Sequence, residues 1–219
     1  RRQNKPVYRA GRFRARFALE SEAAPPHDGS TIGKTLAVSR STFLPFSVPG
    51  IDAEDIQAVV EVLKSGWITT GSRTAAFEKA IADYVGAPYA CALSSGTAGW
   101  HCVALALGLK PGDEVIMPSM TWVSDANVVE LLGAKPVFVD VDRATMLAPA
   151  AAVEAAVTPR TRAILPVHFA GAPVDMDAYR AIAEKNGLAL VEDAAHAIGT
   201  EYKGKKVGAQ GPAIFSFHP

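Results

Sequence analysis

The sequence predicts an α/β fold in which a mainly parallel sheet is flanked by helices. From Phe43 onward, short apolar runs alternate with segments of helical period, and this alternation is typical of βαβ units. The chain has 219 residues, of which 49% are hydrophobic, so it can bury a sizeable core in one globular domain. No internal repeat interrupts this pattern.

The first two helices have the clearest start and stop signals. Asp52 can N-cap a helix with apolar residues at the 3.6 period, and Gly66 closes it. A second helix is predicted from about Ser72 to Tyr84. Later helices are expected to end near Leu107, Leu132, Val157 and Asn186. Strands are expected at 89–93, 114–117, 136–141, 163–167, 188–192 and 213–217.

Residues 1–42 follow neither a helical nor a strand period, so we expect an extension that is disordered or foreign to the fold. Residues 1–40 contain nine basic and three acidic side chains. The net charge is therefore +6 on this segment and −6 on the rest of the chain. We interpret the segment as translated upstream sequence, with initiation near Val38. A transit peptide and a basic nucleic-acid-binding arm are the alternatives.

Composition argues against several classes of function. No window approaches the roughly 18 consecutive apolar residues of a membrane-spanning helix. A net charge of zero and a pI near 7.1 argue against nucleic-acid binding. Two cysteines, Cys91 and Cys102, are too few for a disulfide framework and lack metal-ligand spacing. We therefore expect no metal site and a reducing, cytoplasmic setting.

Three predicted strands are followed by residues suited to binding, and ligands of parallel sheets collect at these carboxyl ends. Gly96, Thr97 and Ala98 form a small-residue turn that can receive a phosphate or be a simple tight turn. Trp122 can stack on a flat ligand or belong to the core. Asp193 can hold a cationic ring nitrogen or cap a helix. Together they describe a pocket for pyridoxal phosphate.

Eight ordered motifs between Phe43 and Pro219 resemble the DegT-type sugar aminotransferases, a family of fold-type-I pyridoxal-phosphate enzymes. They are FLPFS at 43–47, SGWITTG at 65–71, SSGTAG at 94–99, GDEVIMPSMTWVS at 112–124, LLGAKPVFVDVDR at 131–143, VHFAGAP at 167–173, VEDAAHAIGTEYKGKKVGA at 191–209 and AIFSFH at 213–218. Within the family, the motifs are most similar to the branch that makes UDP-4-amino-4-deoxy-L-arabinose for lipid A modification.

The resemblance implies roles for individual residues. Thr97, Ala98 and the adjoining Gly96 would bind the cofactor phosphate together with Ser216. Trp122 would stack on the pyridine face, Asp193 would pair with the pyridinium nitrogen, and His196 would hydrogen-bond the ring hydroxyl. Trp67, Ile68 and Thr69 would border the nucleotide-sugar site near a subunit interface.

Other polar residues in the motifs have a structural interpretation as well. His168 and His218 match family positions, and each is either functional or a histidine that satisfies neighbouring backbone groups. The lysines of YKGKKVG, at 203, 205 and 206, fit a solvated turn between strands better than a catalytic cluster.

The resemblance also implies a fragment. In the family the Schiff-base lysine follows the FSFH serine, so we expect it about two residues beyond Pro219 and no catalytic residue within the chain. Residues 43–219 would then be an incomplete, cofactor-binding large domain, inactive by itself. The full-length protein is expected to be a homodimer.

The favoured function is transfer of an amino group from L-glutamate to a keto nucleotide sugar, of the 4-keto-pentose type, for lipopolysaccharide or a related glycan. Two alternatives stay open. One is a dehydratase or deoxygenation enzyme of the same family, in which histidine replaces the Schiff-base lysine. The other is a non-catalytic, truncated or regulatory chain.

Overall fold

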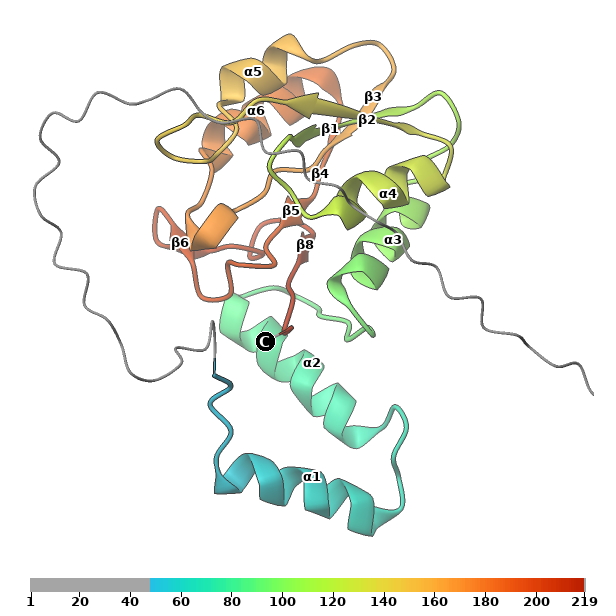
Figure 1. The fold of residues 1–219 in the computed structure, drawn as a ribbon, viewed down its shortest axis with the longest axis vertical. Coiled ribbons are helices and arrows are strands. Elements are labelled where there is room, and N and C mark those ends of the chain that lie inside the picture. The colour runs from blue at the N-terminus through green and yellow to red at the C-terminus, as the bar shows by residue number, and fades with distance from the viewer. Residues whose placement is uncertain (1–47, 219) are drawn as a thin grey trace, which may run out of the picture. The chain divides into compact units, whose positions relative to one another are not determined.

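The computed structural model describes residues 48–218, and within this range a parallel sheet lies between helices (Figure 1). The predicted extension at 1–42 and the FLPFS motif lie outside the described residues. In the sheet, β1 (Glu114–Pro118) pairs with β2 (Lys135–Val139) on one side and β3 (Thr161–Ile164) on the other. All of these pairs are parallel, which confirms the predicted α/β class.

Beyond β3 the four-stranded sheet has one more strand, and a two-stranded parallel sheet follows it. β4 (Ala189–Leu190) pairs with β3, and β5 (Glu192–Asp193) follows β4 after a single residue. Asp193 also forms a parallel bridge with Val167, so residues 189–193 act as one run beside the segment that continues β3. β8 (Ala213–Ile214) pairs in parallel with β5. The carboxyl ends of β1, β5 and β8 therefore lie along one edge of the sheet.

Two helix pairs cover the two faces of this sheet. α3 (Gly96–Ala106) and α4 (Val123–Leu131) pack on the face that receives Val115 and Met117. α5 (Ala150–Ala155) and α6 (Met176–Asn186) pack on the face that receives Ile116. The alternation along β1 follows from the twofold side-chain period of a strand. Burial on both faces explains why β1 has no exposed residue.

The amino end of the sheet is braced by ion pairs. Glu114 is buried, accepts a hydrogen bond from the Thr158 hydroxyl at 2.5 Å, and lies 2.7 Å from Nη2 of Arg160. These donors hold the pKa of the Glu114 carboxyl below its usual value. Asp113 is also buried, and its Oδ1 accepts a hydrogen bond from Nε of Arg162 at 3.0 Å. Each buried carboxylate at this end is thus matched with a cation.

The two N-terminal helices begin and end as predicted. α1 (Ala53–Ser65) starts at Asp52, whose carboxylate accepts hydrogen bonds from the amides of Glu54 and Asp55, and ends at Gly66 in the left-handed conformation. α2 (Ser72–Val85) buries Ala82 and Val85, whereas its aromatic residues Phe77 and Tyr84 are 42% and 50% exposed. No residue of α1 is buried, so its apolar face is open to solvent.

The predicted strand at 89–93 is wrong. These residues form neither a helix nor a strand and pair with no strand of the described residues, and Tyr89 is 88% exposed. A strand needs a hydrogen-bonding neighbour as well as an apolar sequence. The segment is anchored instead by a hydrogen bond from the amide of Ala92 to the Glu78 carboxylate of α2, at 2.8 Å.

Several other strands are shorter than predicted. The expected strand 213–217 pairs only over Ala213–Ile214, and 188–192 is divided between β4 and β5. The YKGKKVG segment forms the antiparallel hairpin β6 (Glu201–Tyr202) and β7 (Lys205–Lys206). No helix of residues 48–218 combines the length and apolar character needed to cross a membrane.

Candidate functional site

Most residues that the sequence singles out lie where strands end. Trp122 is the N-cap residue of α4, at the end of the loop that follows β1, and it is 72% exposed. Asp193 ends β5 and is buried, whereas Ser216 follows β8 and is half-buried. His196 is exposed in the turn after β5. The parallel pairing of the strands therefore brings a flat aromatic ring, a carboxylate and a hydroxyl to one edge.

The turn at the start of α3 forms the second part of the site. Ser95 caps the helix by accepting a hydrogen bond from the amide of Ala98 at 3.1 Å. The amides of Gly96 and Thr97 belong to the first helical turn, where the helix offers no acceptor. A Cβ atom placed on Gly96 would lie 3.8 Å from the Ser216 Cβ, so the turn and Ser216 are neighbours. Amides and a hydroxyl at a helix N-terminus suit an anion.

Asp193 is held in place by its surroundings. Its backbone amide donates to the carbonyl of Pro166 at 2.9 Å, and its Oδ1 accepts from the amide of Ala195 at 3.0 Å. A side chain fixed in this way at the end of a buried strand can present a carboxylate to a cationic group without reorganising.

A second buried carboxyl group, Asp125, lies near Asp193, and no motif in the sequence pointed to it. It comes from the first turn of α4, is 5% exposed, and its carboxyl accepts a hydrogen bond from the Thr121 hydroxyl. Burial, together with the negative charge of Asp193, raises the pKa of Asp125 to about 8. An acidic residue in a first helical turn is ordinarily explained by the helix dipole, so the sequence offered no separate signal.

The three histidines near these strand ends differ in surroundings. His168 is fully buried, with Nε2 3.0 Å from Glu192 Oε2 and Nδ1 accepting from the amide of Val174. This arrangement supports the structural interpretation of His168. Nδ1 of His196 accepts a hydrogen bond from the amide of Ala170 at 3.3 Å, and its ring is otherwise exposed. His218 is exposed beside Ser216.

The predicted sugar-site residues lie apart from this edge. Trp67 and Ile68 are 66% and 70% exposed in the turn between α1 and α2, with Thr69 next to them. The Trp67 indole donates to the carbonyl of Thr70 at 2.9 Å. No hydrogen bond or ion pair of the described residues joins this turn to Asp193 or Trp122.

The lysines of the β6–β7 hairpin have structural partners. Lys203 forms an ion pair with Asp177 of α6, and Lys206 lies 3.3 Å from Glu201 and 4.5 Å from the ring centre of Tyr84. The turn itself uses Lys203 and Gly204 with positive φ, as a two-residue hairpin requires. This geometry agrees with the solvated turn predicted from the sequence.

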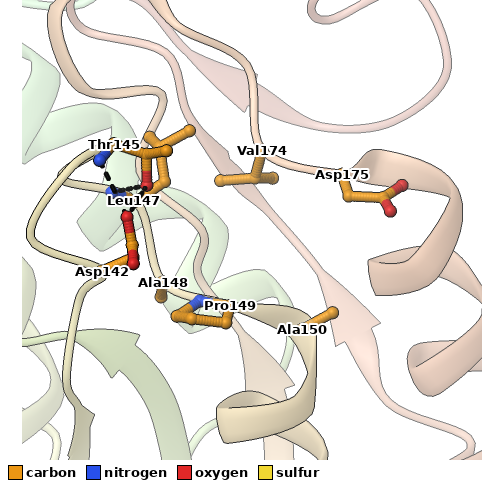
Figure 2. A pocket seen from close by; sticks show the side chains of 8 residues that line it. All are labelled: Asp142, Thr145, Leu147, Ala148, Pro149, Ala150, Val174 and Asp175. Atoms are coloured by element: carbon orange, nitrogen blue, oxygen red, sulfur yellow. Dashed lines mark hydrogen bonds between the residues drawn. The ribbon is translucent and has the colours of Figure 1, made fainter.

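A hollow of about 350 Å³ lies beside α5 and the start of α6 (Figure 2). Its two carboxylates are already used by the fold. Asp142 accepts from the amides and hydroxyl of the turn at 144–145, and Asp175 accepts from the Tyr202 hydroxyl at 2.7 Å. These hydrogen bonds lower the pKa of both carboxyls. None of the site residues predicted from the sequence lines this hollow.

Comparison with known proteins identifies related structures. Residues 49–219 match the DegT/DnrJ/EryC1/StrS aminotransferase family. DesV from S. venezuelae is 42% identical, with a TM-score of 0.74 over 76% of this chain and 45% of DesV. The aminotransferase from Psychrobacter cryohalolentis is 38% identical, with a TM-score of 0.72 over 75% of this chain and 42% of that protein.

Spr1654 from Streptococcus pneumoniae, solved in forms with pyridoxal phosphate (PLP) and pyridoxamine phosphate (PMP), is also similar. In its PLP form it is 36% identical, with a TM-score of 0.77 over 80% of this chain and 49% of Spr1654. The chain thus spans about half the length of these proteins, and its fold is that of fold-type-I enzymes. The family match covers nearly all of the described residues. The chain belongs to the DegT/DnrJ/EryC1/StrS aminotransferase family.

Proposed function

We propose that the full-length protein containing this chain is a pyridoxal-phosphate-dependent sugar aminotransferase. The observation that carries the proposal is the meeting of an anion-binding turn, an exposed flat ring and a buried carboxylate at one sheet edge. This donor set matches the phosphate, the ring and the ring nitrogen of pyridoxal phosphate, so the residues fit the cofactor. When bound, the cofactor supplies an electron sink for amino-group transfer.

The residues of this chain would then have distinct tasks. The first turn of α3 and the Ser216 hydroxyl would hold the phosphate by hydrogen bonds, which fixes the cofactor at one end. Trp122 would cover one face of the ring and exclude water there. Asp193 would keep a proton on the ring nitrogen by a charge-assisted hydrogen bond. His196 would hydrogen-bond the ring hydroxyl.

The proposed substrate pair is L-glutamate and a UDP-linked 4-keto pentose, as in the formation of UDP-4-amino-4-deoxy-L-arabinose for lipid A. Its support is the resemblance of the motifs at 65–71 and 191–209. Trp67, Ile68 and Thr69 would border the nucleotide sugar, and their exposure leaves them free to do so. The lysine that binds the cofactor covalently would follow residue 219. We place the enzyme in the cytoplasm as a homodimer.

The test uses the full-length protein and two readouts. Titration with pyridoxal phosphate is followed by absorbance, and L-glutamate with the UDP-4-keto pentose is then added and the products identified by mass spectrometry. We expect cofactor binding, 2-oxoglutarate and an aminated sugar. Asp193→Asn should lower the transfer rate at least about tenfold, since a charge-assisted hydrogen bond is lost.

Glu130→Gln, on the exposed side of α4, is the control and should keep the wild-type rate. A product that has lost water instead of gaining an amino group would replace the transferase by the dehydratase. A full-length protein that binds no cofactor would contradict both enzymes and leave the non-catalytic chain.

A further inference from the structure

A short 3₁₀ turn, η1 (Phe169–Gly171), is joined by hydrogen bonds to the segment that follows β5. The amide of His168, at the start of η1, donates to the carbonyl of Asp193 at 3.0 Å. At the other end, the hydroxyl of Thr200 donates to the carbonyl of Gly171 at 2.9 Å. The two segments are therefore connected on both sides of the residues that lie between these bonds.

The ring of His196 lies between these connections, and η1 makes two contacts with it. The amide of Ala170 donates a hydrogen bond to Nδ1 of His196 at 3.3 Å. The Phe169 ring meets the imidazole edge to face, with 5.8 Å between the ring centres and 61° between the planes. The His196 side chain is otherwise exposed. One hydrogen bond and one aromatic contact from η1 thus hold an imidazole that could otherwise rotate in solvent.

The backbone of η1 has an unusual conformation at the donor. Ala170 has φ 51° and ψ 28°, in the left-handed region that a residue with a side chain rarely adopts. Gly171 follows with φ 81°, and a Cβ atom placed on it would lie 3.3 Å from the carbonyl oxygen of His196. Such conformations persist where the surrounding structure imposes them, and they gather at functional sites. Here the conformation places the Ala170 amide at the His196 ring.

The hydrogen bond from Ala170 determines which nitrogen of His196 carries the proton. A ring nitrogen that accepts a hydrogen bond from an amide has no proton of its own. A neutral imidazole has a single ring proton, which must then lie on Nε2. Within residues 48–218, no hydrogen bond engages Nε2 of His196. The Nε2 proton is thus a donor available to a ligand at this edge of the sheet.

We propose that η1 is a positioning element, in which Ala170 and Phe169 fix His196 with its proton on Nε2, so that it donates to the ring oxygen of pyridoxal phosphate. The proposal rests on the proposed function, because only the cofactor supplies that oxygen. A donor at this place favours the ionised form of the ring hydroxyl. Asp193 and His196 belong to one turn, and a single ring carbon separates the carbon that bears the hydroxyl from the ring nitrogen, so one turn can serve both groups.

The first experiment reads the tautomer of His196 without cofactor. The full-length apoprotein is labelled with ¹⁵N at histidine and held at about pH 8, where an ordinary imidazole is neutral. We expect the His196 ring to show an unprotonated Nδ1 and a protonated Nε2, and His196→Gln assigns these signals by removing them. A short histidine peptide, which exchanges between the two tautomers, is the reference. Averaged nitrogen shifts like those of the peptide, or a protonated Nδ1, would overturn the fixed tautomer.

Variants of η1 then test whether this turn holds the ring. Phe169→Leu removes the aromatic contact, and Gly171→Ala adds a Cβ against the carbonyl of His196. Either variant should shift the His196 nitrogens toward the averaged values of the peptide, and circular dichroism shows which variants remain folded. Ala172→Ser is the matched control, since residue 172 is exposed directly after η1, and it should keep the wild-type shifts. Wild-type shifts in the folded η1 variants would overturn the positioning role.

The second experiment tests the acceptor of the Nε2 proton. Affinities of the full-length protein are measured for pyridoxal phosphate and for the analogue that lacks the ring hydroxyl. Wild type should bind pyridoxal phosphate about fivefold more tightly, because the analogue cannot accept the hydrogen bond. His196→Ala should lose this preference. His196→Gln should regain most of it, since its amide can both accept from Ala170 and donate to the cofactor.

The same ratio of affinities separates the positioning role from the proposed function. Phe169→Leu should lower the preference, whereas Ala172→Ser should keep it. An unchanged preference in His196→Ala or in folded Phe169→Leu would overturn the inference, while binding of pyridoxal phosphate would still support the proposed function. A wild-type protein that has the fixed tautomer but binds neither compound would overturn the proposed function, and with it the acceptor assigned to His196.

Discussion

His168 and Glu192 form a buried pair that ties the segment after β3 to β5. The Nδ1 atom of His168 accepts from the amide of Val174, so the ring proton lies on Nε2 and is donated to Glu192. Because His168 is fully buried and Glu192 is 4% exposed at its side chain, neither group can turn to water. The pair fixes the backbone next to Asp193, since the amide of His168 donates to the Asp193 carbonyl at 3.0 Å.

Removal of the His168 ring should therefore lower the stability of the folded protein. His168→Ala leaves the Glu192 carboxylate buried without its donor and is expected to lower the free energy of unfolding by about 3 kcal/mol. Urea unfolding of the full-length protein measures the change. Glu192→Gln keeps an acceptor for Nε2 of His168 and should lower the free energy of unfolding by a smaller amount. If His168→Ala unfolds at the same urea concentration as wild type, the pair does not brace the fold.

At this scale, the sequence indicated where single residues lie along the fold better than which residues surround them. Trp122 and Asp193 could be placed because a strand and its carboxyl end are visible in the local pattern. The burial of Asp125 depends on how α4 packs against α3 and the sheet, and that packing involves residues far away in sequence. Whether His168 is buried could not be read from the sequence either, because its partners, Val174 and Glu192, are brought to it by the fold.

α1 shows how much of an element its own sequence can specify. Asp52 and Asp55 form a reciprocal capping box, and Gly66 ends the helix with positive φ. Since no residue of α1 is buried, these local interactions and the ion pair between Glu61 and Arg73 of α2 are its main described supports. Local signals of this kind are readable in sequence, which explains why the bounds of α1 were predicted closely.

Loss of the cap should loosen α1 without unfolding the sheet. Asp52→Ala removes the acceptor for two amides, which weakens the helix by about 1 kcal/mol. Hydrogen exchange of α1 amides should then accelerate, while amides of β1 keep their rates. Asp52→Asn retains the cap and serves as the control. Equal acceleration in β1 would show that α1 and the sheet open together.

The segment 89–93 shows where a local signal fails. Its alternation of small and apolar residues resembles that of a strand, but a strand is completed by a neighbour that the sequence of the segment does not contain. The same argument explains why 213–217 pairs over two residues only. Periodicity indicates which segments can be extended, whereas pairing decides which of them become strands.

Over the molecule as a whole, apolar surface gathers on the N-terminal helices. Ile56, Val59 and Leu63 lie at helical spacing on α1 and are each about 60% exposed, with Trp67 in the following turn. A stripe of this kind is unusual for a helix that faces only water. It gives physical support to the homodimer that we propose for the full-length protein.

Charges in this stripe should separate the subunits. Ile56→Glu combined with Leu63→Glu places two carboxylates at the centre of the apolar face, which should shift the full-length protein from dimer to monomer in sedimentation velocity. Gln57→Glu adds a charge on the polar side of α1 and should leave the dimer intact. A double variant that sediments like wild type would exclude this face as the subunit interface.

The contact between Gly96 and Ser216 has a consequence for biosynthesis. The anion-binding turn leaves the ribosome early, whereas Ser216 arrives only after β8 has been translated and has paired with β5. At about 5–20 residues per second, this interval lasts several seconds or more. Strands β1 to β4 can form their pairs in that time, so the nascent chain acquires its sheet before it can hold a phosphate. A bound cofactor would therefore stabilise a late stage of synthesis and could not guide an early one.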